Sequence, residues 1–204
     1  IQVPSEFKSH SAIRKVVNIK PTPGNVYHLK MNDVKYLTPQ DSTTLNIKGA
    51  FAGRLIMDDE HGQEDGTPGR TVVIGIEKSD VPQPVLVENF KATGSNYNSA
   101  LMNARNIDYR FTQTDSLLIF DRHIQLAQKS PWRQQYVSLI LKIPVGTELV
   151  IDRNVRRYLQ NVDFDDCREK TTLEHSRSAP FIMGDNGLQC YMPEMPDTTR
   201  LKNP

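Results

Sequence analysis

The sequence predicts a mainly β fold of short stacked strands, in a solenoid-like arrangement, with one principal α-helix near residues 95–106. Three observations predict it. Many short segments alternate apolar and polar residues, which is the period of a half-buried strand. Gly or Pro lies at most of the breaks between these segments. A single segment places its apolar residues at helical spacing.

The N-terminal half supplies strand segments in close succession, at residues 12–19, 25–31, 44–58, 71–80 and 84–93. The first two flank the sequence KPTPG, in which two prolines and a glycine disfavour regular structure. The segment 44–58 consists of a strand pattern, a glycine break and a second strand pattern. This repetition favours stacked strands, although no strict sequence period supports a regular solenoid.

An acidic loop, DDEHGQEDGTPG, occupies residues 58–69. A calcium-binding loop needs glycine at its sixth position, and Gln63 stands there when counting starts at Asp58. The loop is therefore interpreted as a solvated hairpin tip rather than a metal site.

The predicted helix begins near Ser95 or Asn96, either of which can cap it. Its apolar face is formed by Tyr97, Ala100, Leu101, Ala104 and Ile107. Most of these residues are small, so the helix is expected to pack closely against a sheet. The period then changes to two, which predicts a hairpin that turns at residues 112–115.

The segment QQYVSLILKIPVGTELVIDRN, residues 134–154, predicts two strands joined by a bend. Val137, Leu139, Leu141 and Ile143 share one face of the first strand, and Leu149 and Ile151 share one face of the second. Pro144 cannot donate to a sheet ladder, and Gly146 can take a positive φ. The pattern fits either a tight hairpin or a corner of a stacked sheet.

The C-terminal part is less regular. Residues 154–180 predict a polar helical turn and a loop, and residues 181–192 predict a hairpin around Asp185-Asn186-Gly187. The whole is interpreted as a single β-rich domain, residues 1–192, followed by a loosely ordered tail, residues 193–204.

The composition is that of a globular protein, with 204 residues, 37% hydrophobic and 24% charged residues, and a formal net charge of +1. This charge excludes a strong field that would attract nucleic acid, and the few aromatic residues do not alternate with basic ones. No apolar run is long enough to span a bilayer. Because the chain begins at Ile1 without an initiator Met, we expect that a preceding targeting or anchoring segment has been removed.

No catalytic chemistry is predicted. The five histidines occur singly, without a metal-binding pair, at His10, His28, His61, His123 and His175. No glycine-rich phosphate loop and no nucleophile elbow is present. The expectation is a protein that is not an enzyme, with no catalytic, cofactor-binding or metal-binding residues and no cofactor.

Three blocks of the second half resemble the C-terminal region of phage-shock-protein-C-like membrane proteins of Bacteroidetes. The first is a Gly-Ser helix start with two alanines, followed by an Ile-x-Tyr strand. The second is a Trp-Arg-x-Gln-x-Val strand that continues into Pro-x-Gly-Thr and a strand ending in aspartate. The third is Met-x-x-x-Gly-Leu-x-Cys. The matching residues are Gly94, Ser95, Ala100, Ala104, Ile107, Tyr109, Trp132, Arg133, Gln135, Val137, Pro144, Gly146, Thr147, Asp152, Met183, Gly187, Leu188 and Cys190.

The resemblance is strongest over residues 94–191 and implies a toast-rack fold, a rack of short strands. It also implies a domain at the periplasmic face of the inner membrane, which is anchored by spans upstream of Ile1. The implied role is sensing or regulation of envelope stress through protein partners in the envelope. The family's small phage-shock domain and its membrane spans are absent from these 204 residues.

The two cysteines, Cys167 and Cys190, leave three alternatives open. An oxidising periplasm favours a disulfide between them. Either could instead be a nucleophile with a distant histidine, although no local signature supports this, or both could be buried thiols. The basic cluster RNVRR, residues 153–157, could contact anionic headgroups. Because the acidic cluster DFDD follows closely, mutual neutralisation is the preferred interpretation.

Two functional classes follow. The first is a non-catalytic sensor or scaffold domain whose strand edges or loops bind protein partners. The second is a surface adhesin or carbohydrate-binding module. A sugar site usually needs exposed aromatic platforms, and the sole tryptophan, Trp132, lies in a block that resembles structural sequence. The first class is therefore favoured.

Overall fold

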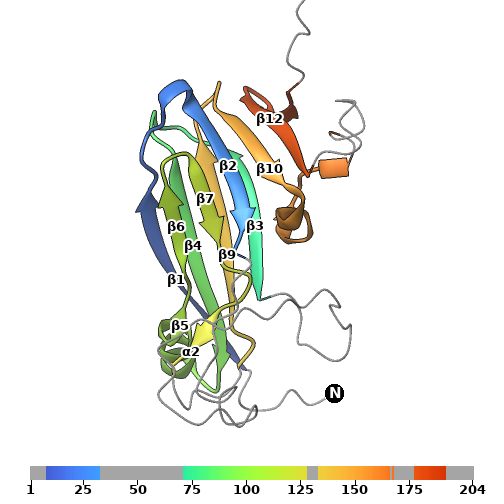
Figure 1. The fold of residues 1–204 in the computed structure, drawn as a ribbon. Helices are drawn as coiled ribbons and strands as arrows, with labels where there is room; N and C mark the ends of the chain where they lie inside the picture. The colour runs from blue at the N-terminus through green and yellow to red at the C-terminus, as the bar shows by residue number, and fades with distance from the viewer. Residues whose placement is uncertain (1–7, 33–70, 128–132, 166, 168–176, 192–204) are drawn as a thin grey trace, which may run out of the picture.

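A computed structural model describes residues 8–32, 71–127, 133–165, 167 and 177–191. Within these residues two β-sheets enclose a hydrophobic core, and one helix lies at one end of the first sheet (Figure 1). The fold is mainly β with one main helix, as the sequence predicts.

The first sheet has five strands, in the order β1 (Ser9–Asn18), β4 (Val85–Gly94), β9 (Tyr136–Ile143), β3 (Val72–Lys78) and β11 (Leu159–Gln160). The second sheet has six, in the order β13 (Gly187–Cys190), β12 (Ser178–Gly184), β10 (Glu148–Asp152), β2 (Val26–Met31), β7 (Leu117–Phe120) and β6 (Phe111–Thr114). A separate short pair joins β5 (Ile107–Asp108) to β8 (Gln125–Leu126). The helical elements whose bounds are described are α2 (Tyr97–Arg105) and two 3-10 turns, η2 (Pro23–Asn25) and η3 (Arg153–Tyr158).

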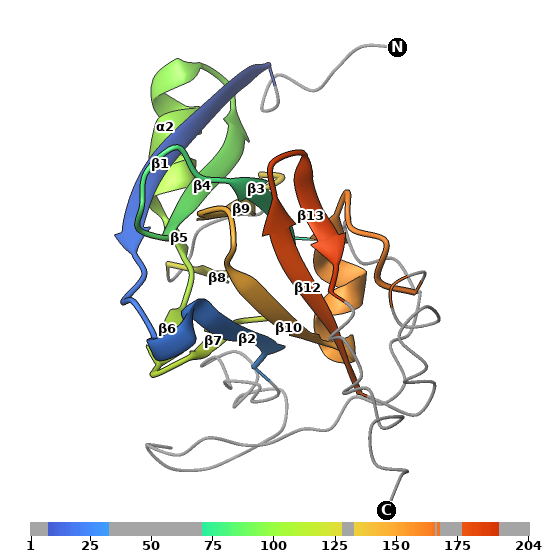
Figure 2. The same ribbon diagram turned by 90° about the horizontal axis from the view of Figure 1, so that it is seen from above.

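The chain moves repeatedly between the two sheets. The strand β9 belongs to the first sheet and β10 to the second, so the bend between them is a corner and not a hairpin (Figure 2). Thr147 N donates a hydrogen bond to Pro144 O over 3.2 Å, and Gly146 has a φ of 84°, which is type II turn geometry. Such crossings place the central strands parallel, β3 with β9 in one sheet and β10 with β2 in the other.

The core lies between the two sheets, and the alternation of β9 accounts for its centre. The four apolar residues predicted to share one face, Val137, Leu139, Leu141 and Ile143, are all fully buried. Leu149 and Ile151 of β10 are buried as well, which confirms the predicted face of the second strand. The second sheet adds Tyr27, Leu29 and Phe120 to the same cluster.

The hairpin at the C-terminal end is confirmed. The strands β12 and β13 pair antiparallel with Gly184 opposite Gly187, and Gly187 has a φ of 114°. The predicted helical turn after β10 is η3, which leads into the short strand β11 that the sequence pattern did not predict. The hairpin of β6 and β7 is also confirmed, with a shorter turn than expected, because β6 continues to Thr114.

Three expectations about local structure need correction. Asn25 belongs to η2 with a φ of 53°, so β2 begins one residue later than predicted. Ile107 lies in β5, because α2 ends at Arg105. Tyr97, expected on the apolar face of the helix, is 63% exposed. The helix approaches the sheet so closely that only small side chains, those of Ala100 and Ala104, fit beneath it.

Several interpretations concern residues outside the described part of the chain. These are the strand–glycine–strand segment at residues 44–58, the acidic loop at 58–69, Trp132, and the tail at 193–204.

Candidate functional site

A side-chain cap fixes the first turn of α2, and two contacts hold the helix against the end of β4. Asn96 caps it, since its Oδ1 accepts a hydrogen bond from Ser99 N over 2.9 Å. Asn103 Nδ2 donates to Thr93 O over 2.8 Å. Gly94 lies directly against the backbone of Ala100. These contacts hold the helix beside β4 and β1 (Figure 1).

A pocket of about 260 Å³ lies between this helix, β5 and the inner face of β1 and β4. Its apolar lining includes Ile13, Phe90 and Ile107, of which the last two are buried. Its polar lining includes Lys15, Arg105 and Asp108, all of them exposed. The buried side chains of the lining are therefore mostly apolar, and its charged side chains are the exposed ones.

A buried carboxylate lies next to this pocket. Glu88 is 1% exposed and occupies the inner face of β4 between Leu86 and Phe90. Its neighbours across the sheet are Lys15 on β1 and Leu139 on β9. Lys15 Nζ lies 3.2 Å from Glu88 Oε2, and this oxygen has no other hydrogen-bond partner among the described residues. The ion pair ties the edge strand to the core, because a buried carboxylate without its cation is costly.

The sequence interpretation missed Glu88. A signal for it was present, since the alternation of β4 places a carboxylate on a face whose other residues are apolar, and Lys15 interrupts the corresponding face of β1 in the same way. Two opposite charges at such positions on separate strands predict a pair across a sheet.

A second polar cluster adjoins the pocket through Tyr109. Tyr109 is 7% exposed, and its hydroxyl donates a hydrogen bond to Asp121 O over 3.0 Å. Burial, with the nearby carboxylates of Asp121 and Glu88, raises the pKa of Tyr109 well above 10.0. Asn32 Nδ2 donates to Asp121 Oδ1 over 2.6 Å. Burial raises the pKa of Asp121 above 3.8, and the Asn32 hydrogen bond and the Arg110 charge oppose this shift.

Asp121→Asn tests this cluster by its pH dependence. Because the pKa of Asp121 is raised in the folded state, the folded protein keeps the proton at pH values where the unfolded chain has lost it. The stability contributed by this proton is complete below the unfolded pKa and is lost as the pH rises through the folded pKa. Asparagine retains an oxygen acceptor for Asn32. We therefore expect the free energy of unfolding of the variant to fall less as the pH rises through this acidic range.

The measurement is denaturant unfolding at a series of pH values from below 3.8 to neutrality. Asp115→Asn is the matched control, because Asp115 is an exposed aspartate in the turn between β6 and β7. If the free energy of unfolding changes with pH equally in the wild type and in Asp121→Asn, the pKa of Asp121 is not raised in the folded state.

The strand β1 is an edge of the first sheet, and no described strand pairs with its other side. Ile19 N donates to Pro84 O over 3.0 Å, and the register places Asn18 opposite Val85. By the alternation of an antiparallel ladder, the odd-numbered residues bond to β4 and the even-numbered residues direct N–H and C=O groups away from it. The outward groups belong to His10, Ala12, Arg14, Val16 and Asn18.

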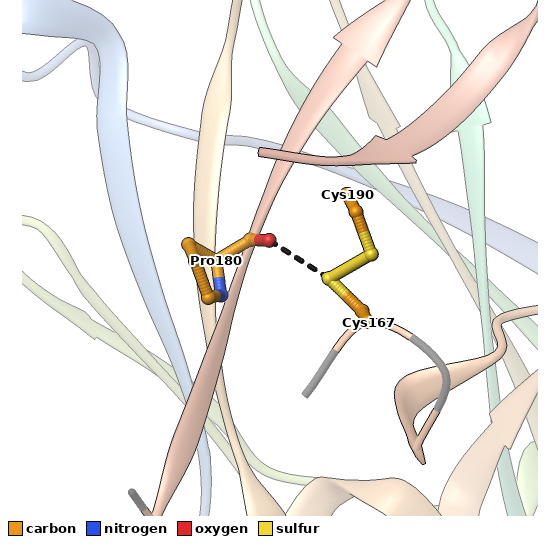
Figure 3. Close-up of a disulfide and its surroundings, with 3 residues drawn as sticks. All are labelled: Cys167, Pro180 and Cys190. Carbon is orange, nitrogen blue, oxygen red and sulfur yellow. Dashed lines mark hydrogen bonds between the residues drawn. A yellow bond between two sulfur atoms is a disulfide. The ribbon is translucent and has the colours of Figure 1, made fainter. Parts of the chain in front are cut away.

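The two cysteines are joined by a disulfide with a Cα–Cα distance of 5.3 Å (Figure 3). Cys167 is fully buried, and its sulfur lies 3.1 Å from Pro180 O. A disulfide sulfur carries no hydrogen to donate, so this is a packing contact. A nucleophilic cysteine needs an accessible thiolate, whereas Cys167 is buried and both sulfurs are joined in the disulfide.

The structure does not bring the other candidate residues together. His10, His28 and His123 are exposed on separate segments, and His61 and His175 lie outside the described residues. No group of three or more metal-binding side chains occurs in the part of the chain that the structure describes. Arg156 forms an ion pair with Asp165, which supports neutralisation of the basic cluster by the acidic one. None of the described helices is long and apolar enough to cross a membrane.

Two sheets of short strands joined by corners, with the helix at one end, define a β-rich domain of two packed sheets. A family model described as a toast rack found in some PspC proteins matches residues 57–195, more than half of the chain. The chain therefore belongs to this toast-rack family, and the match extends further towards the N-terminus than the three sequence blocks did. No curated protein and no solved structure matches the chain.

Proposed function

We propose that this domain is the non-catalytic, envelope-facing interaction module of a membrane-anchored PspC-like protein. It acts as a sensor or scaffold in envelope stress by binding a protein partner at the periplasmic face of the inner membrane. Membership of the PspC toast-rack family supports the setting. The observation that carries the interaction role is the long edge strand β1.

Several features of β1 favour strand addition by a partner. Edge strands are usually protected by shortness, by charged side chains, by proline, by a bulge or by a covering element. The charges of β1, at Arg14 and Lys15, disfavour pairing with a basic strand and leave an acidic strand as the compatible partner. The strand β1 pairs with β4 in an uninterrupted register from Ser9 to Asn18 and contains no proline. An extended partner segment can therefore add to its outward backbone groups. Attachment to the membrane would raise the local concentration of such a partner and strengthen weak contacts.

Val16→Pro tests this role. Val16 is 57% exposed and directs its N–H away from β4, so proline there removes a docking donor and keeps the ladder with β4. We expect the variant to fold with near wild-type stability and to lose its cross-linked partner in envelopes, together with the envelope-stress response. The measurement is cross-linking of the full-length protein, wild-type against variant.

Val145→Pro is the matched control. Val145 is an exposed valine at the second position of the type II turn, where proline is favoured, and it lies outside β1. If Val16→Pro leaves both the partners and the stress response intact, β1 is not the docking edge. If the purified domain instead binds a defined glycan tightly, the adhesin class replaces the interaction module.

A further inference from the structure

We propose that the pocket beneath α2 is a specificity pocket for the β1 edge, and that it receives one large apolar side chain from an acidic, extended segment of a protein partner. This inference rests on the proposed docking at β1 and adds the chemistry of the docked segment.

The register of β1 places the pocket beside an added strand. Ile13 and Lys15 project from β1 towards the inner side of the first sheet, and both line the pocket. Residues directly opposite one another on neighbouring strands project to the same face. A partner residue opposite Ile13 or Lys15 therefore projects towards the pocket, and its neighbours in sequence project to the outer face.

The size and lining of the pocket indicate which side chain enters it. Its volume of about 260 Å³ is below the usual range for cofactors and drug-sized ligands, roughly 300–1,000 Å³. An apolar cavity of about 150 Å³ already accommodates a benzene molecule. The buried residues of its lining are Phe90, Ile107, Tyr109 and the small Ala104. A phenylalanine or leucine side chain fits this lining better than a charged one.

The charge of the edge selects the rest of the segment. Lys8, Arg14, Lys15 and Lys20 lie on or directly beside β1, and the strand itself contains no aspartate or glutamate. Because Lys15 is paired with the buried Glu88, Arg14 is the outward-facing cation at the centre of the strand. Arg105 adds a further cation at the rim of the pocket, opposed by Asp108. Directly opposite like charges destabilise a strand pair, so a second copy of β1 is disfavoured and an acidic strand is favoured.

The probe is a fluorescein-labelled peptide of alternating Glu and Thr with one central Phe, titrated with the 204-residue protein and followed by fluorescence anisotropy. We expect binding that becomes about ten- to a hundredfold weaker when the central Phe is replaced by Ala, because a buried phenylalanine ring is lost. A peptide with Lys in place of every Glu is expected not to bind. Val16→Pro is expected to abolish binding of the Phe peptide.

Ile13→Trp tests the pocket from the protein side, since the larger side chain fills the pocket from the half-buried edge strand. We expect it to remove the difference between the Phe and Ala peptides. Val17→Trp is the matched control, because Val17 has the same strand and face and lies outside the pocket lining. Thermal unfolding shows whether each variant is folded. If Ile13→Trp does not fold, the affinities of the wild-type protein for the Phe and Ala peptides test the pocket.

If the protein binds the Phe and Ala peptides with equal affinity, or binds neither, the pocket does not receive an apolar side chain of the partner and the proposal is wrong. Binding that Val16→Pro abolishes but the Phe-to-Ala change does not affect leaves the edge as the docking site and removes only the pocket. Tighter binding of the Lys peptide than of the Glu peptide overturns the acidic partner.

Discussion

Replacement of Leu141 or Leu139 by alanine is expected to lower the free energy of unfolding by about 2–5 kcal/mol. Both residues are fully buried on the inner face of β9, near the middle of the first sheet. Leu141 is flanked by Leu86 on β4 and Ile76 on β3, and the core between the two sheets covers it. Alanine leaves a cavity that these neighbours, held by strands on both sides, can fill only in part.

The measurement is urea unfolding of each variant, and Ile140→Ala is the control. Ile140 lies between Leu139 and Leu141 on the same strand, but its side chain is on the outer face and is only half-buried. We expect the control to cost roughly 1 kcal/mol, near the average for point substitutions. Losses of equal size at Ile140 and Leu141 would mean that the assigned inner face is wrong.

Gly94→Ala is expected to destabilise the protein by about 1–3 kcal/mol or more, by forcing α2 away from the end of β4. A Cβ at Gly94 would lie 2.8 Å from Ser99 C and 2.9 Å from Ala100 Cα, and closer still to Ala100 N. These are backbone atoms of the helix, so no side-chain rotation relieves the overlap. The cap at Asn96 and the hydrogen bond from Asn103 to Thr93 hold the helix in this place.

Gly75→Ala is the matched control for this steric effect. Gly75 is also a strand glycine of the first sheet, but a Cβ there meets only Leu139 O at 3.9 Å, an ordinary contact. Denaturant unfolding of the two variants is expected to separate them clearly. A Gly94→Ala protein as stable as the wild type would show that the helix does not sit against Gly94. Because displacement of α2 also opens the pocket, weaker binding of the Phe peptide is expected to accompany the loss of stability.

Patterns within single segments determined much of this protein. Periodicity assigned the helix and the inner face of β9, and the turn residues Asp185-Asn186-Gly187 assigned the C-terminal hairpin. Each of these features depends on residues close together in the chain. The sequence also indicated that Gly146 could take a positive φ, since Pro144 and Gly146 interrupt the strand pattern there, and the observed φ is 84°. Three short blocks in order were enough to indicate the toast-rack family, which the family match confirms.

Tertiary structure decided which strands neighbour one another, and with them the candidate site. The bend at Pro144-Val145-Gly146 fits a hairpin as well as a corner, and only the pairing of β9 with β3 and of β10 with β2 distinguishes these alternatives. The ion pair of Lys15 with Glu88 joins segments 73 residues apart in the sequence. The pattern of each strand shows one inward-facing charge, and only the pairing of β1 with β4 brings the two charges together. The exposure of Tyr97 follows from the close approach at Gly94, because a helix face is apolar only where a neighbouring element covers it. The pocket and the edge at β1 have the same physical reason. Among the described strands β1 is the last of its sheet, and the helix covers only part of its inner face.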